Sequence, residues 1–73
     1  MAQRQEWEYL FVDIMPDGHT VQEVWSSGGE HQSFARIQEK PKIVEYFDKI
    51  GAAGWELTVY RANLRQFIFK RPK

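Results

Sequence analysis

Ile50-Gly51-Ala52-Ala53-Gly54-Trp55-Glu56-Leu57 is the stretch in which a helical pattern ends, two glycines turn the backbone and an alternating strand pattern begins. Pro41, upstream of it, suits the first turn of a helix, because its missing N–H is not needed there. We therefore expect a helix that begins near Pro41 or Lys42 and buries one apolar face. The residues of that face recur at the i, i+1, i+4 and i+7 spacing: Ile43, Val44, Phe47 and Ile50.

The two glycines predict how this helix ends. Gly51 stands where a helix often needs a left-handed residue after its last turn. Gly54 supplies a second permissive backbone position before Trp55 enters the strand. A bulky side chain at either glycine is therefore expected to lower stability.

Strand patterns flank the helix on both sides. Residues 6–14 are apolar on both faces, residues 55–62 alternate cleanly, and residues 66–71 follow after a loop at 63–65. We expect the aromatic faces of these strands to pack under the apolar face of the helix and form one core. Between residues 15 and 40, turn signals at 16–18 and 26–30 separate short strand patterns at 20–25 and 33–38. An inserted hairpin is the preferred interpretation of this segment, and a flexible loop is the alternative.

Length and composition bound the fold. A chain of 73 residues is a single domain spanning 1–73, and it has no cysteine to staple a small core. We predict an α+β domain with an antiparallel sheet of four to five strands and one α-helix packed on one face. The expected order is β, β-hairpin insertion, α, β, β.

The charge pattern excludes some classes of protein. The formal net charge is zero, which argues against a strongly basic nucleic-acid binder or a polybasic membrane binder. No apolar run approaches the roughly 20 residues of a membrane span, and residues 1–6 lack the apolar core of a signal peptide, so a soluble cytoplasmic protein is expected. Residues 5–35 carry six acids and no Lys or Arg, whereas residues 57–73 carry five bases and no acid. We expect these charges to pair across neighbouring strands; the alternative is a basic tail for an anionic partner.

The chain resembles a family of small bacterial proteins, the domain of unknown function 4177. The resemblance rests on Trp7-Glu8-Tyr9, the 50–57 run and Phe67-Ile68-Phe69-Lys70-Arg71-Pro72, and it covers residues 6–14 and 43–72. The segment between Gly18 and Pro41 is longer than is usual for that family. What the resemblance implies is a compact sheet with one helix, and it brings no known activity or catalytic residues.

Catalytic and metal-binding patterns are weak. His19 and His31 lie 12 residues apart in polar, loop-like sequence near Asp17 and Glu30. Two histidines and a carboxylate can bind a transition metal or transfer protons, but nothing in the sequence brings these into one site. We expect no enzyme activity, no metal and no cofactor.

The sheet face opposite the helix is the candidate functional feature. One helix cannot cover both sides of a sheet, and an exposed apolar patch is a feature that monomers usually avoid. The cover is expected to be the inserted hairpin, through Val21, Val24 or Trp25, or a second copy in a homodimer, or another protein. The candidate interaction residues are Leu10, Val12, Ile14, Trp25, Tyr60 and Ile68.

Two other functions stay open. Aromatic side chains on the sheet could stack on the nucleobases of a single-stranded nucleic acid, while basic side chains of the C-terminal strands contact its phosphates. These basic residues are Arg61, Arg65, Lys70 and Arg71. A small-molecule pocket between the inserted hairpin and the sheet, lined by Trp25, Phe34 and Tyr60, is the third hypothesis.

Overall fold

The computed structural model describes residues 6–34 and 40–73. Within these residues, five strands, an α-helix and a short 3-10 turn follow one another along the chain. Their bounds are β1 Trp7–Ile14, β2 Val21–Ser26, β3 His31–Ser33, α1 Ile43–Ala52, β4 Glu56–Arg61, η1 Ala62–Leu64 and β5 Gln66–Pro72.

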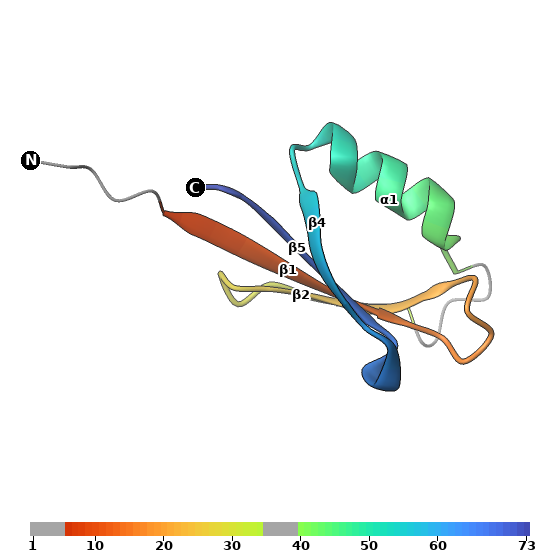
Figure 1. The fold of residues 1–73 in the computed structure, drawn as a ribbon. Coiled ribbons are helices and arrows are strands. Elements are labelled where there is room, and N and C mark those ends of the chain that lie inside the picture. The colour runs from red at the N-terminus through yellow and green to blue at the C-terminus, as the bar shows by residue number, and fades with distance from the viewer. Residues whose placement is uncertain (1–5, 35–39) are drawn as a thin grey trace, which may run out of the picture.

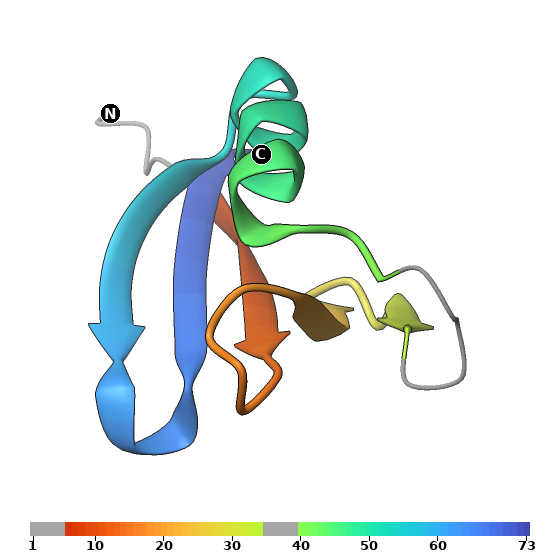
Figure 2. The same cartoon turned by 90° about the vertical axis from the view of Figure 1, so that its right-hand side faces the viewer.

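The five strands form one antiparallel sheet in the order β3-β2-β1-β5-β4. α1 lies against one side of this sheet (Figure 1), near the end at which β4 begins (Figure 2). The predicted α+β class, with one packed helix, is therefore confirmed. No helix in the described part of the chain is long and apolar enough to cross a membrane.

The segment inserted before the helix is a hairpin that extends the sheet. β2 pairs with β1 on one side and with β3 on the other. The connecting turn is closed by hydrogen bonds from the Ser26 amide to the Glu30 carbonyl (2.9 Å) and from the Gly29 amide to the Ser26 carbonyl (3.0 Å). Because the turn is short, the second strand of the hairpin begins at His31 rather than at the predicted residue 33. Residues 35–38, the rest of the predicted strand, lie outside the described residues.

The helix ends in a left-handed cap at Gly54. The Gly54 amide donates to the Gly51 carbonyl (3.0 Å) and the Trp55 amide donates to the Ile50 carbonyl (3.1 Å), the two bonds of a Schellman motif. Gly54 has a φ of +95°, whereas Gly51 lies inside the last helical turn. The prediction that Gly51 is the left-handed residue is therefore wrong, and the cap lies three residues later.

The core lies between the sheet and α1, and it contains the even-numbered residues of β1. Leu10, Val12 and Ile14 are 8%, 0% and 5% exposed and belong to the same buried cluster as Ile50 of the helix. The prediction that these three residues face away from the helix is wrong. The physical reason is register: Leu10 lies opposite Phe69, and both side chains point to the face that α1 covers.

A β-bulge in β4 corrects a second prediction. Leu57 lies opposite Phe69 but Val59 lies opposite Ile68, so one extra residue is accommodated between them. Thr58 supports the bulge, because its hydroxyl donates to the Ile68 carbonyl at 2.7 Å. Simple alternation predicts Leu57 and Val59 on one face and Tyr60 on the other. The bulge reverses this assignment beyond Thr58, so Val59 faces away from the helix and Tyr60 faces toward it.

Candidate interaction face

We call the side of the sheet away from α1 the open face. All five strands belong to the sheet, and η1 is part of the connection from β4 to β5. Among residues 6–34 and 40–73, no helix or strand therefore lies over this face (Figure 2). One alternative from the sequence is that the inserted hairpin covers this face. Instead, the β2–β3 hairpin lies in the plane of the sheet and buries Val21 and Val24 on the helix side.

A row of large side chains crosses the open face from one edge strand to the other. Residues directly opposite each other in neighbouring strands share a face. The register gives the pairs Trp25↔His31, Phe11↔Trp25, Phe11↔Ile68 and Val59↔Ile68. We call this set the central row, and its members, one from each strand, are His31, Trp25, Phe11, Ile68 and Val59.

Partly exposed aromatic and aliphatic side chains adjoin one another on the open face. Trp25 is 43% exposed and Val59 is 47% exposed, and Phe11 and Ile68 between them are half-buried by their neighbours. Trp7 and Tyr9 extend the aromatic surface along β1 and are 36% and 40% exposed. Exposed apolar side chains that adjoin one another are typical of an interaction surface rather than of ordinary solvated surface.

Three contacts hold the aromatic rings of this face in place. The His31 ring stacks on Trp25 with a centroid distance of 3.7 Å and an interplanar angle of 14°. The His31 Nε2 also lies 3.8 Å from the Glu23 carboxylate. On the other side of the central row, the Lys70 ammonium lies 4.2 Å from the centroid of the Trp7 ring. Rings that are already fixed lose little side-chain entropy when they bind.

Charged residues flank the central row on both sides. Beyond one side lie Glu23, Asp13, Gln66 and Arg61, joined by the pairs Asp13↔Glu23, Asp13↔Gln66 and Arg61↔Gln66. Beyond the other side lie Tyr9, Lys70 and Glu56, joined by the pairs Tyr9↔Lys70 and Glu56↔Lys70. Both signs of charge are present, so the open face has an apolar centre and a mixed polar border.

The sequence prediction therefore identified part of this face. Of the candidate interaction residues, Trp25 and Ile68 lie on it, whereas Leu10, Val12, Ile14 and Tyr60 lie on the helix side. Tyr60 stacks on Phe67 with a centroid distance of 4.4 Å. The residues that the prediction missed are Trp7, Tyr9, Phe11 and Val59. Aromatic side chains were assigned to the core because they bury the most area, and no local signal in β1 separates its two apolar faces.

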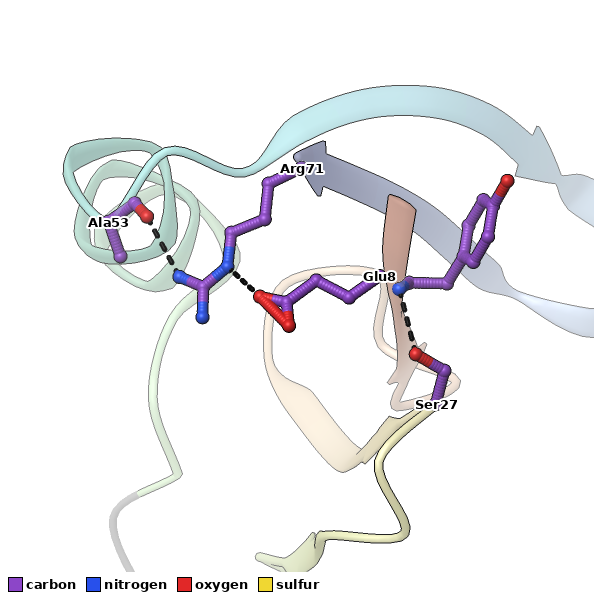
Figure 3. Close-up of polar contacts among 5 residues, drawn as sticks. Glu8, Ser27, Ala53 and Arg71 are labelled. Atoms are coloured by element: carbon purple, nitrogen blue, oxygen red, sulfur yellow. Dashed lines mark hydrogen bonds and ion pairs between the residues drawn. The ribbon is translucent and has the colours of Figure 1, made fainter. Parts of the chain in front are cut away.

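Arg71 holds the end of the sheet to the helix (Figure 3). Its Nη1 donates to the Ala53 carbonyl at 2.8 Å, its Nε is paired with the Glu8 carboxylate, and its guanidinium lies 4.3 Å from the Trp55 ring centroid. The ion pair between Glu8 and Arg71 confirms the predicted charge pairing between the first and last strands at this position. Arg71 is thus occupied on the helix side.

The four basic residues of the nucleic-acid hypothesis are not brought together. Arg61 and Lys70 lie on the open face but on opposite sides of the central row. Arg65 lies in the β4–β5 connection, where its φ is +49°, and Arg71 is on the helix side. Among the residues that the structure describes, no continuous basic track joins them on either face.

A shallow cavity of about 350 Å³ opens on the helix side, between α1 and the β2–β3 hairpin. Leu10 and Val24 line it from the sheet, and Tyr46 lines it from the helix, where partial burial raises the pKa of its phenol. The predicted small-molecule pocket is not formed, because Trp25 lies on the open face and Tyr60 lies on the far edge strand. Phe34 packs against Tyr46 at a centroid distance of 6.2 Å.

The backbone of His19 and the ring of His31 make local contacts in different parts of the structure. The Asp17 carboxylate accepts hydrogen bonds from the His19 amide (2.8 Å) and the Thr20 amide (3.2 Å), and the first of these is the main reason that the pKa of Asp17 is lowered. His31 is stacked on Trp25, in a different part of the molecule. Within the described ranges, no group of three or more His, Cys, Asp or Glu side chains could hold a metal ion.

Comparisons with family models, curated proteins and solved structures found no match for this chain. The resemblance to the domain of unknown function 4177 therefore stays a prediction.

Proposed function

We propose that this protein is a non-catalytic interaction module that associates with a second copy of itself through the open face. The observation that carries the proposal is the central row, in which apolar and aromatic side chains from five strands adjoin without a covering element in the described residues. Packing two such faces together would bury both rows, as two sheets do in a β-sandwich. Burial of apolar surface would supply the driving force.

The mixed charge of the open face favours a protein partner over a polyanion. Asp13, Glu23 and Glu56 lie on the border of the open face, together with Arg61 and Lys70. A nucleic-acid backbone would meet three carboxylates on this face, whereas a second copy of the same face presents both signs of charge. The chain has no cysteine and needs no oxidising compartment, so we propose that it acts in the cytoplasm.

Single-stranded nucleic acid is the second candidate, and one observation favours it. Trp7, Tyr9 and Trp25 present exposed rings on a sheet, which is how several single-strand-binding domains stack bases. A protein that copurifies with nucleic acid would show a raised ratio of absorbance at 260 nm to that at 280 nm.

Size-exclusion chromatography with light scattering tests the proposal, with absorbance recorded at both wavelengths. We expect a dimer for the natural chain and a monomer for Phe11→Glu, which places a charge at the centre of the central row. Val44→Glu is the matched control. The prediction that Val44 belongs to the buried face of the helix is wrong: Val44 is 72% exposed, and Tyr46 packs against the core instead. Val44 lies on α1, away from the open face, so its replacement should leave the mass unchanged.

A monomeric natural chain over micromolar to millimolar concentrations would refute self-association. A dimer that Phe11→Glu leaves intact would refute the open face as its interface, provided that circular dichroism shows the variant to be folded. Salt-sensitive binding to short oligonucleotides that Trp25→Ala abolishes would favour the second candidate instead.

A further inference from the structure

We propose that the two copies pack face to face about a two-fold axis that runs along the central row. The central row of one copy then lies over the central row of the second copy. This inference rests on the proposed self-association and specifies its geometry. The two copies of a face-to-face pair present the same patch, and their two-fold axis lies in the plane between the sheets. Its direction within that plane decides which residues meet.

An axis along the central row overlaps the whole apolar surface. It crosses all five strands, so β1 of one copy lies over β1 of the second copy and β4 lies over β4. Phe11 then faces Phe11, Ile68 faces Ile68 and Val59 faces Val59. Every strand that contributes to the central row is covered, because the row spans the sheet from β3 to β4.

The same axis brings opposite charges together. The residues on one side of the central row in one copy then lie over those on the other side in the second copy. On β4, Glu56 faces Arg61 of the second copy, and Arg61 faces Glu56 of the second copy. On β1, Tyr9 faces Asp13 of the second copy. Lys70 lies directly opposite Tyr9 on β5, so its positive charge is near that Asp13. The border of the open face is therefore complementary to itself.

An axis parallel to the strands fits less well. Placed over β1, it would set Asp13 directly against Asp13 of the second copy, and like charges that face each other are unfavourable. Moved to the gap between β1 and β5, it would pair Arg61 with Glu23 of the second copy. It would then leave β3 and its stacked His31 without a partner, because the sheet order is β3-β2-β1-β5-β4.

Pairing through the edge of the sheet is disfavoured by β4 itself. β4 is an edge strand with exposed Leu57 and Tyr60, but the bulge between Leu57 and Val59 interrupts its regular pattern of amide and carbonyl groups. Bulges of this kind are a common protection of edge strands against pairing with another chain. The open face is the better surface for a second copy.

Charge exchange on β4 tests the direction of the axis. We expect Arg61→Glu to raise the Kd of the dimer by roughly tenfold, because two symmetry-related contacts become repulsive. The double variant Glu56→Arg with Arg61→Glu should recover the natural Kd to within about threefold, because both attractive contacts return with their signs exchanged. Glu23→Arg combined with Arg61→Glu is the matched control, and it should stay weak.

Recovery by Glu23→Arg instead of Glu56→Arg would overturn the inference in favour of an axis parallel to the strands. A dimer that is insensitive to all three variants would overturn it as well, while leaving self-association intact. A natural chain that never dimerises would refute the proposed function itself, so the two failures are distinguishable.

Spin labelling provides an independent measurement, because the chain has no cysteine and a single introduced one carries the only label. A label at Val59→Cys and, in a separate variant, a label at His31→Cys should each lie close to the same label on the second copy, because stacked sheets are about 10 Å apart. Both variants should therefore show strong dipolar broadening. An axis parallel to the strands would separate these edge-strand labels to roughly twice that distance, and the absence of broadening in a dimeric sample would overturn the proposed axis.

Discussion

Replacing each of the two glycines at the end of α1 by alanine should change stability in opposite directions. Gly54 has a φ of +95°, and a non-glycine residue in left-handed backbone costs about 1–2 kcal/mol. The lower entropy of the unfolded alanine chain offsets about half of that. We therefore expect Gly54→Ala to lower the free energy of unfolding by about 1 kcal/mol, although a Cβ there would meet no atom within 4 Å.

Gly51→Ala is the matched variant, three residues away in the same motif. Gly51 lies in the last turn of α1 with no positive φ, and a Cβ at this position also meets no atom within 4 Å. Alanine in a helix is favoured over glycine by about 0.5–1 kcal/mol. We expect Gly51→Ala to raise the free energy of unfolding by about that amount.

Thermal unfolding followed by circular dichroism measures both effects. For a domain of this size, 1 kcal/mol corresponds to about 4–8 °C in Tm, so the two variants should differ by roughly 10 °C. Both must be measured at the same protein concentration, because self-association makes Tm depend on concentration. A loss of stability in Gly51→Ala equal to that in Gly54→Ala would refute the assignment of the left-handed cap to Gly54.

The remaining predictions concern the core, the turn before β2, the Arg71 contacts and the bulge. Val12→Ala should cost about 2 kcal/mol in urea unfolding, because Val12 is fully buried and the change leaves a cavity; a cost below about 0.5 kcal/mol would contradict the burial of the even-numbered face of β1. Asp17→Asn should lower stability at neutral pH but not under acid conditions. The native pKa of Asp17 is lowered, so its contribution is present above the ordinary value of 3.8 and is lost as pH falls through the native pKa; an equal loss at both pH values would exclude the carboxylate as the cause. Arg71→Lys should cost less than about 1 kcal/mol, because the pair with Glu8 is partly exposed, and Glu8→Gln should cost less than Arg71→Lys, because the bond to Ala53 remains. Thr58→Val should cost about 1 kcal/mol through loss of the bond to the Ile68 carbonyl, and an unchanged urea midpoint would show that the hydroxyl does not support the bulge.

The sequence predicts that one face of the sheet is apolar and uncovered, but it does not predict most of the residues on that face. The expectation of an uncovered apolar sheet face followed from one helix and too many apolar strand residues, and Trp25 and Ile68 were assigned to it. The other residues of that face escape the prediction because the sequence places the aromatic faces of the strands in the core. In β1 the smaller aliphatic residues fill the space under α1, and Trp7, Tyr9 and Phe11 lie on the other side.

The sequence by itself determined the local elements: one helix, although not the residue that caps it, the β4–β5 hairpin and, as the preferred of two interpretations, the hairpin inserted before the helix. Each depends on residues a few positions apart, such as the apolar spacing from Ile43 to Ile50. Only the tertiary structure decided which face of β1 is buried, because both faces are apolar and the choice depends on the register with β5 and on where α1 lies. It also decided the side on which Val59 and Tyr60 lie, because a bulge that adds one residue to an edge strand reverses every later side chain without leaving a local pattern in the sequence.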